Sequence, residues 1–520
     1  LELPPLAVDD AHDLVRLVSG FDGDVGPWAE SLVRDAGGNT MFLVELARSA
    51  GVAGGAATLD ELLRRRIAQL AAPVRALLTT CAVAGRPMPL AIAAQAADVD
   101  DAGAALATLR AERLVRATGD RIEPFHDRVR AAVTDELPHD RLAAIHAALA
   151  RAYHALAPDQ PEPLVDHLLG AGATDEVAAP AMRAATAAAQ ILAFRRAADL
   201  YAIALEFGEL PPAERQATLV AQAGALVNAG QVTAAAVAYR EAAAQAQGEA
   251  RFELRRLQLE QLLRAAELRE GMALANELLA ELGRTLPVGP RGVAWAVIKQ
   301  RAALRLRGKR FKPRAAAALP PAAVREVDAL WSIASGLAFA NPALGKVVQL
   351  WHLRAALALG ERSRVAQALA IEIGYLGVAG SATAKACQRA GAEAQALADE
   401  LGESRLIGLV ATCKGFATFL NGQWNQARHD LELGHRLMSD EGVSARWELD
   451  LNEMFHLAAL YYAGETRELV RLTPLYLRDA EDRGDVYAQH GLRAWRSNQA
   501  WLVQDKPEDA RAHVLGVAQA

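Results

Sequence analysis

The feature that most constrains the fold of this chain is a trio of small or apolar residues that recurs from residue 197 onward. In each copy the residues stand at positions i, i+4 and i+7, which lie on one face of an α-helix. Successive copies begin 36 to 42 residues apart across residues 197–271 and 427–510, close to the period of helix-hairpin repeats. This spacing predicts that the second helix of each hairpin packs through that face. The clearest copies are Ala197, Tyr201 and Ala204; Ala235, Tyr239 and Ala242; and Ala427, Leu431 and Gly434.

Composition favours the same fold class. Hydrophobic residues make up 52% of the 520 residues, yet aromatic residues only 5%, and much of the remainder is alanine. Alanine has the highest helix propensity. We therefore predict an all-α fold in which residues 141–520 form a tetratricopeptide-like α-solenoid, with an irregular helical bundle as the alternative. Because the chain starts at Leu1 and stops at Ala520 inside a helical pattern, we expect a piece of a longer protein, with this arm truncated at its C-terminus.

The first 140 residues have a different pattern. Residues 1–56 read as helices separated by loops, and residues 57–140 as several helices followed by a short region of partial apolar and polar alternation. That region, residues 114–125, turns at Gly119-Asp120, which predicts one small β-hairpin. A further helix begins at His126. Helices, a hairpin and a closing helix together indicate a winged-helix domain over residues 57–140.

The chain lacks the motif that holds a nucleotide triphosphate. A phosphate-binding loop needs a glycine-rich turn that ends in Gly-Lys-Ser/Thr. The two Gly-Lys pairs, Gly308-Lys309 and Gly345-Lys346, are followed by Arg310 and Val347. We therefore expect no nucleotide cofactor and no catalytic residue in this piece.

Charge and cysteine usage exclude further classes. The formal net charge is −6, whereas a general nucleic-acid binder is usually basic. The three cysteines have no metal spacing, and neither do the histidines near residues 139–167, so no metal site is expected. No stretch approaches the roughly 20 apolar residues that cross a bilayer. We expect a cytoplasmic protein with no membrane partner.

Three local sequences, in this order, resemble the STAND class of signalling ATPases. Gly38, Asn39 and Thr40 open a segment similar to the Gly-Asn-Pro motif of the helical lid, with Thr40 in place of proline. Phe125-His126-Asp127 is similar to the hydrophobic-His-Asp motif of the winged helix, and the repeat arm is the third part. The resemblance implies that residues 1–56 are a lid remnant. It also implies that His126 and Asp127 lie near the phosphates of ADP in the intact parent, which would use ATP or ADP with Mg.

Segments of the arm are similar to a narrower group. Trp331–Leu337 and Trp447–Asp450 resemble the C-terminal arm of bacterial serine/threonine protein kinases fused to an AAA-type ATPase module and tetratricopeptide repeats. Large LuxR-type ATPase regulators carry a similar arm, so both parents remain open.

The resemblance implies a non-catalytic sensor and coupling region. The arm would bind a protein or a small ligand, and the winged helix would couple that event to the nucleotide state of an ATPase core upstream in the same chain. The alternative is a DNA-binding transcription regulator that uses the winged helix and the basic run from Lys299 to Arg314. The expected recognition helix, residues 102–112, contains a single arginine, Arg110, which makes nucleic acid the less favoured partner.

Overall fold

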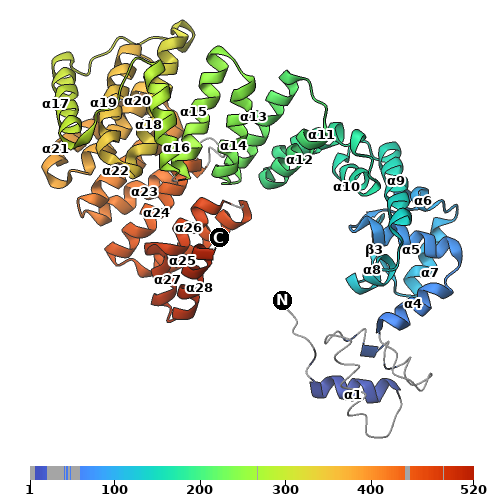
Figure 1. Cartoon of the computed structure of the whole chain (residues 1–520). Coiled ribbons are helices and arrows are strands. Elements are labelled where there is room, and N and C mark those ends of the chain that lie inside the picture. The colour runs from blue at the N-terminus through green and yellow to red at the C-terminus, as the bar shows by residue number, and fades with distance from the viewer. Residues whose placement is uncertain are drawn as a thin grey trace. The chain divides into compact units, whose positions relative to one another are not determined.

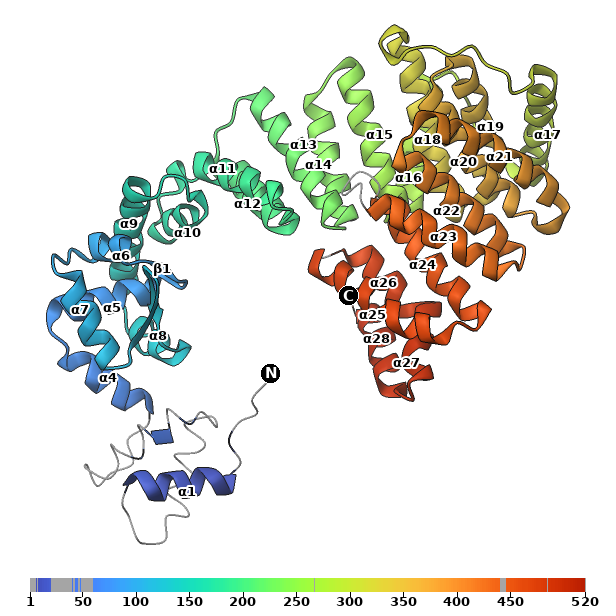
Figure 2. The same ribbon diagram turned by 180° about the vertical axis from the view of Figure 1, so that it is seen from behind.

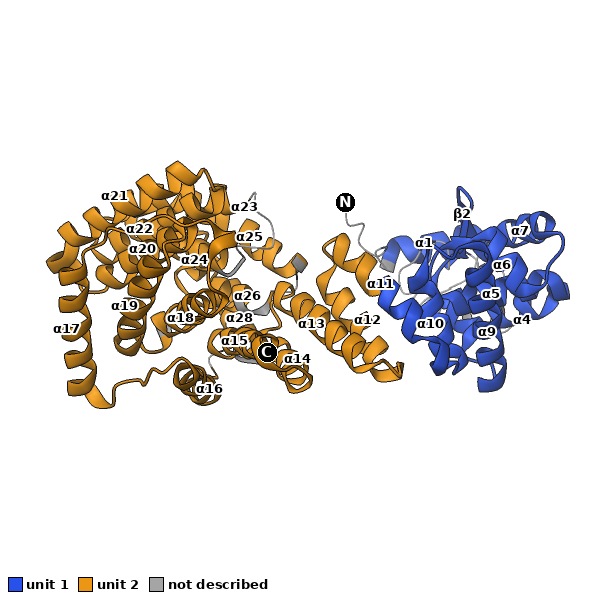
Figure 3. Cartoon of the chain, turned by 90° about the horizontal axis from the view of Figure 1, so that it is seen from above, with its two compact units in different colours: residues 1–184 blue, residues 185–520 orange. Residues whose placement is uncertain are grey.

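The computed structural model describes residues 6, 8–19, 40, 43–44, 47, 59–265, 267–439, 446–483 and 485–519. These residues form two compact units, residues 1–184 and 185–520 (Figure 3). Both units are built almost wholly from helices, with one small sheet in the first (Figures 1 and 2). The predicted fold class, all-α with a small β element and a helical solenoid, is confirmed.

The first unit contains the only strands among the described residues. Its elements are α1 (Val8–Ser19), α4 (Leu59–Gln69), α5 (Ala72–Ala84), β1 (Met88–Pro89), α6 (Leu90–Ala97), α7 (Ala102–Ala111), β2 (Val115–Thr118), β3 (Arg121–Pro124), α8 (Asp127–Thr134), α9 (His139–Leu156), α10 (Pro161–Ala171) and the 3₁₀ turn η1 (Thr174–Glu176). Helix α11 (Ala178–Gln190) spans the boundary between the units.

The predicted hairpin is present as strands β2 and β3, which pair antiparallel with Ala117 opposite Ile122. Gly119 in the turn has a φ of +63°, a conformation that glycine adopts without a steric cost. A third strand, β1, adds to the free edge of β3 and gives the order β1-β3-β2. The sequence analysis missed β1 because a two-residue strand has no periodicity to detect.

Helix α5 forms the centre of this unit. It packs against α6, α7, α8 and α9, and its side chains from Leu77 to Ala84 are buried. Helix α9 also packs on α6. The sequence analysis placed most of α9 in the arm, but α9 lies within the first compact unit. The observed boundary between the units falls at residue 184.

The second unit is a series of helices that pack on their sequence neighbours. Its elements are α12 (Phe194–Phe207), α13 (Pro212–Asn228), α14 (Val232–Gln245), α15 (Gly248–Arg264), α16 (Leu268–Glu281), α17 (Gly289–Arg307), α18 (Pro321–Ala340), α19 (Pro342–Leu359), α20 (Arg362–Gly377), α21 (Ala384–Leu401), α22 (Ser404–Leu420), α23 (Trp424–Ser439), α24 (Arg446–Ala463), α25 (Thr466–Arg483), α26 (Val486–Ala494), α27 (Gln499–Val503), α28 (Pro507–Gln519) and the 3₁₀ turns η2 (Ala316–Ala318), η3 (Gly380–Thr383) and η5 (Arg496–Asn498).

Hairpins stack in this unit through their first helices. The pairs α18/α19, α20/α21, α22/α23 and α24/α25 are hairpins, and α18 contacts α20, α20 contacts α22, and α22 contacts α24. The four first helices therefore make a continuous layer, as expected when each repeat buries its apolar face on the next. Helix α17 is an exception, because it stands outside these pairs and packs on α19.

The predicted repeat residues lie on three second helices, α12, α14 and α23. All nine are buried, and the two tyrosines keep only 6% of their surface exposed. They are Ala197, Tyr201, Ala204, Ala235, Tyr239, Ala242, Ala427, Leu431 and Gly434.

The closest helix approach near these residues is between α22 and α23. A Cβ atom added to Gly415 would lie 3.2 Å from the carbonyl oxygen of Ala427, and one added to Gly408 would lie 3.3 Å from that of Gly434. On α23, a Cβ added to Gly434 would lie 2.8 Å from Nδ2 of Asn452, which donates a hydrogen bond to Thr412. The α22–α23 contact therefore depends on residues without side chains.

Replacing Gly434 by alanine should destabilise the arm by about 1–3 kcal/mol, because the added methyl group overpacks this contact. Gly224 is the matched control, since it lies inside helix α13 and an added Cβ would meet no atom within 4 Å. There the same substitution should stabilise by about 0.5–1 kcal/mol through helix propensity. Thermal unfolding of the two variants should shift in opposite directions. Equal shifts would contradict the packing described for α22 and α23.

No helix in the described ranges is both long enough and apolar enough to span a bilayer.

Candidate ligand-binding pocket

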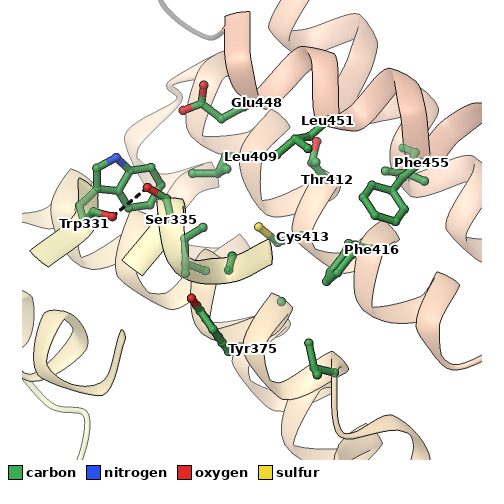
Figure 4. A pocket seen from close by; sticks show the side chains of 15 residues that line it. Trp331, Ser335, Tyr375, Leu409, Thr412, Cys413, Phe416, Glu448, Leu451 and Phe455 are labelled. Atoms are coloured by element: carbon green, nitrogen blue, oxygen red, sulfur yellow. Dashed lines mark hydrogen bonds between the residues drawn. The ribbon is translucent and has the colours of Figure 1, made fainter. Parts of the chain in front are cut away.

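An apolar pocket opens in the layer of first helices of the second unit (Figure 4). We call it the arm pocket. Helices α18, α20, α22 and α24 supply most of its wall, and one residue comes from α23. Its lining residues are Trp331, Ser335, Ala338, Ile371, Gly374, Tyr375, Val378, Leu409, Thr412, Cys413, Phe416, Leu431, Glu448, Leu451 and Phe455.

Helix α20 of this wall, and α19 that precedes it, start at defined positions. Asn341 caps α19 by accepting a hydrogen bond from the Leu344 amide at 3.2 Å. Glu361 caps α20 and accepts from the amides of Ser363 and Arg364 at 3.0 and 2.9 Å. Such side chains satisfy amides at a helix N-terminus that have no partner within the helix. The caps therefore fix where α19 and α20 begin, and with them the side of α20 that faces the pocket.

Small residues on two helices leave the space that the pocket occupies. Ser335 and Ala338 on α18 and Gly374 on α20 carry short side chains or none. Aromatic residues bound the other side, where the rings of Phe416 and Phe455 meet edge to face with centroids 4.8 Å apart. An edge-to-face pair holds both rings in a preferred geometry. The pocket is thus a gap between small residues on one side and fixed rings on the other.

Three hydroxyl groups in the wall already make hydrogen bonds within the protein. The hydroxyl of Tyr375 donates to the carbonyl oxygen of Ala334 at 2.5 Å, and that of Ser335 donates to the carbonyl oxygen of Trp331 at 2.9 Å. Thr412 accepts from Asn452 at 2.8 Å. Figure 4 shows Ser335, Tyr375 and Thr412 among apolar side chains. A ligand in the arm pocket would therefore find few hydrogen-bonding partners.

One carboxylate reaches the rim. Glu448 on α24 lines the pocket, but its side chain is only 12% exposed and accepts a hydrogen bond from Arg405 at 3.1 Å. The arginine balances the carboxylate, so the rim carries little net charge. An anionic ligand gains nothing here, and a cationic one would have to compete with Arg405.

A thiol also faces the pocket. Cys413 on α22 is buried, and burial raises its pKa to about 12. A thiol with so high a pKa stays protonated at neutral pH and is a poor nucleophile. Cys413 therefore acts as an apolar wall residue.

Size and polarity together define the ligand. The free volume is about 100 Å³, of the same order as apolar cavities that accept benzene-sized molecules. Largely apolar walls favour an uncharged apolar ligand, because burying a polar group without a partner is costly. The arm pocket fits a small aromatic or short alkyl molecule, or one apolar side chain of a larger partner.

A second hollow, of about 510 Å³, lies on the opposite face of α22. Its polar lining residues include the amides Gln388, Gln395, Asn421 and Gln426 and the charged residues Lys414 and Asp430. Amides both donate and accept hydrogen bonds, which suits a peptide backbone better than an apolar molecule.

His126 lies at the start of α8 in the first unit. Its backbone is extended, with φ −153° and ψ 154°, and its Nδ1 accepts a hydrogen bond from the Arg128 amide at 3.2 Å. This is the geometry of a helix N-cap. Asp127 follows in the first turn with its side chain 89% exposed, 3.7 Å from Arg130. The role of His126 and Asp127 near a nucleotide remains a prediction for the intact parent.

The predicted lid motif falls mostly outside the part of the chain that the structure describes. Gly38 and Asn39 are not among the described residues, and Thr40 is described as an exposed helical residue. Leu43 and Ala47, further along the same motif, are buried.

The surface of α7, the helix expected to read DNA, carries little positive charge. Three exposed aspartates, Asp98, Asp100 and Asp101, precede or cap it, and Arg110 is its one basic residue. Negative charge at the end of a helix that would enter a DNA groove repels phosphate. The geometry gives the DNA-binding alternative no support at this helix.

Two of the four histidines considered for a metal come together. Nδ1 of His146 on α9 lies 3.1 Å from Nδ1 of His167 on α10. Burial is the first cause that lowers the pKa of both, that of His167 to about 3. Within the described residues no third ligand completes a metal site. His154, which lies two helical turns after His146, is exposed.

Sequence reasoning did not single out most of the arm pocket. Tyr375, Phe416 and Phe455 are spread over 80 residues and three helices. The sequence does show a small residue, Gly374, followed by an aromatic residue, Phe416, in the first helix of the next hairpin. Ordinary packing between helices gives the same pattern, so it does not indicate a pocket.

No protein-family model and no curated protein matches this chain. Among solved structures it is similar to a signal transduction ATPase with numerous domains (STAND) protein with a tetratricopeptide repeat sensor from Pyrococcus horikoshii, at 11% identity and a TM-score of 0.33. The match covers 99% of this chain and 72% of the other. This match does not assign a function to the chain.

Proposed function

We propose that this chain is the non-catalytic sensor and coupling region of a larger ATP-dependent signalling protein of the STAND class. The observation that carries the sensor role is the arm pocket, an apolar cavity between four successive hairpins of a helical repeat arm. A ligand between the hairpins contacts α18, α20, α22 and α24 together. It would therefore stabilise one relative arrangement of the repeats over others.

The coupling role rests on the motifs of the first unit. His126 caps α8 directly after the β2–β3 hairpin, the position of the histidine in the STAND winged helix that it resembles. In the intact parent we propose that this histidine contacts the phosphates of ADP, and that ligand binding to the arm changes this contact. The serine/threonine protein kinase parent remains our first choice, with the LuxR-type regulator as the alternative.

The sensor role predicts that toluene, a small apolar probe, raises the thermal unfolding temperature of the arm. Free ligand at a hundred times its dissociation constant stabilises the folded state by about 2.7 kcal/mol. In Ala338→Leu the longer side chain occupies the arm pocket, so the shift should vanish.

The matched control is Ala244→Leu, at an exposed position of α14, which should keep the full toluene shift. If toluene shifts wild type and Ala338→Leu equally, it binds elsewhere and the sensor proposal loses its support. A shift in neither protein would show that the cavity does not accept an apolar ligand.

A further inference from the structure

One stretch of the second unit is strongly basic, although the chain as a whole has a net negative charge. Between Glu281 and Glu326 there is no aspartate or glutamate, while the full sequence has 62 acidic and 56 basic residues. The stretch includes helix α17 and the loop that follows it. Its eleven basic residues are Arg284, Arg291, Lys299, Arg301, Arg305, Arg307, Lys309, Arg310, Lys312, Arg314 and Arg325.

Helix α17 is packed on one side only. Leu304 is its buried residue, and on the same side Gln300 accepts a hydrogen bond from Arg354 of α19. Three large apolar side chains on the helix are exposed instead: Trp295 at 66%, Ile298 at 58% and Leu306 at 91%. So large an exposed apolar area on one helix marks an interaction surface.

The exposed residues form a ridge with cations beside it. At about 100° per residue, Trp295, Ala302 and Leu306 lie within about 40° of one another around the helix axis. Arg291 and Lys299 lie about 40° to either side of Trp295. We call the three apolar residues, together with Ile298, the α17 ridge. On the outer face of α17, Lys299 and Arg305 thus lie at the two edges of the apolar ridge, and Arg291 lies within it, between Ile298 and Ala302 around the axis.

Most of the cations near the ridge have no acidic partner. Arg301 pairs with Glu372, and Lys309 pairs with Glu393 at 2.5 Å. Among the described residues no carboxylate pairs with the other basic side chains beside the ridge or in the following loop. These are Arg291, Lys299, Arg305, Arg307, Arg310, Lys312 and Arg314.

We propose that the α17 ridge and the basic loop after it bind the surface of an anionic phospholipid bilayer. The helix would lie in the plane of the interface with Trp295, Ile298 and Leu306 inserted among the acyl chains. The cations would contact lipid phosphates. Basic residues beside a stripe containing tryptophan and leucine are the composition of helices that lie on membranes, and tryptophan favours the headgroup level.

Charge and shape favour this occupant over two others. Duplex DNA satisfies the cations, but it offers adjacent apolar side chains only scattered thymine methyl groups. An acidic protein helix would have to supply a groove for a convex ridge, whereas a bilayer accepts a convex apolar ridge without a preformed groove. The expectation of no membrane partner was based only on the lack of a membrane-spanning segment. A helix that lies on the membrane surface does not need such a segment. Such binding would hold the sensor arm at a membrane.

The test is co-sedimentation of the 520-residue chain with lipid vesicles. The chain should sediment with vesicles that contain phosphatidylglycerol and not with vesicles of phosphatidylcholine alone, and added salt should weaken the binding. Lys312→Gln/Arg314→Gln should weaken it about 25-fold, since each basic residue near an anionic surface contributes about fivefold. Trp295→Ser/Leu306→Ser should weaken it at least about tenfold, because both apolar anchors are lost.

Leu515→Ser is the control, because Leu515 on α28 is also exposed, at 49%, but lies outside the basic stretch. It should bind as wild type does. Failure of the wild-type chain to sediment with anionic vesicles would overturn the proposal, as would binding that Trp295→Ser/Leu306→Ser leaves unchanged. Tighter binding to duplex DNA than to anionic vesicles would assign the surface to nucleic acid and also overturn it.

Discussion

Lowering the pH from 7 to 5 is expected to reduce the free energy of unfolding of the repeat arm by about 4 kcal/mol. Two buried histidines cause the loss. The ring of His352 is fully buried and its pKa is lowered to about 3 by burial. The side chain of His456 is 3% exposed, and burial, followed by the nearby His435 and Arg428, lowers its pKa to about 4.

The direction follows from the proton count of each state. In the unfolded chain a histidine titrates near pH 6.5. Between that value and the lowered folded pKa, the unfolded state binds a proton that the folded state does not. Stability is therefore fully present above about pH 6.5 and is lost as the pH falls toward 4 and 3. At pH 5 each histidine costs about 2 kcal/mol, because one pKa unit corresponds to about 1.4 kcal/mol.

The groups that lie within hydrogen-bond distance of the two rings are uncharged. Nδ1 of His352 lies 3.2 Å from the side-chain oxygen of Gln349, and Nδ1 of His456 lies 3.2 Å from the hydroxyl of Tyr476. Neither neighbour is an anion, so neither compensates a proton gained by its histidine. Asp430 acts in the opposite direction, since burial raises the pKa of its carboxyl; it offsets part of the loss in acid.

Calorimetry of the chain at pH 7 and pH 5 measures the effect. In His352→Asn a donor remains near the position of Nδ1, but the titrating group is gone. The variant should therefore lose about 2 kcal/mol less than wild type between the two pH values. An identical loss in wild type and variant would mean that His352 does not titrate as a buried neutral ring.

The sequence predicted those helices and strands whose pattern lies within one helix face or one turn. The turn at Gly119 and the apolar alternation around it predicted β2 and β3, because hairpin register depends on residues a few positions apart. The trio ending at Gly434 predicted a buried helix face, and the structure places that residue against Thr412 and Asn452.

The arm pocket could not be predicted in the same way. Its wall runs from Trp331 to Phe455 over four helices, and local periodicity indicates only that each of these faces is buried. Whether two buried faces meet without a gap depends on side-chain volumes at helix crossings. A Cβ atom added to Gly374 would lie 3.8 Å from the ring of Phe416, which is an ordinary contact distance. A Cβ atom added to Gly434 would instead clash with Asn452, 2.8 Å away. The sequence does not distinguish these two glycines.

The sequence showed where charged residues are concentrated, but it did not show which residues they pair with. The basic run from Lys299 to Arg314 was recognisable as a positive surface, and seven of the eleven cations between Glu281 and Glu326 do lack a carboxylate partner in the described residues. Arg301 does not follow that pattern, because its guanidinium reaches Glu372 on α20. Those two residues are 71 positions apart, and no pattern in either helix predicts the pair.

Removing Arg301 is expected to destabilise the second unit by about 3 kcal/mol, because it leaves the charge of Glu372 buried without its partner. The Glu372 side chain is 2% exposed, while that of Arg301 is 25% exposed. Loss of one partner of a buried ion pair typically costs about 3–5 kcal/mol. The partial exposure of Arg301 puts the expected value at the lower end. Arg301→Met keeps most of the side-chain volume and removes the charge.

The double variant Arg301→Met/Glu372→Met separates the cost of an unpaired charge from the loss of packing. With both charges gone and similar volumes retained, most of the stability should return, because apolar replacements of a buried pair are often neutral. Lys309→Met is the matched control, since its pair with Glu393 is 36% and 46% exposed and should contribute less than about 1 kcal/mol. The measurement is the rate of amide hydrogen exchange in α17. This rate is sensitive to each substitution because the Arg301–Glu372 pair joins α17 to α20. If the double variant exchanged as fast as Arg301→Met, the cost would come from packing, and the buried charge of Glu372 would not be its cause.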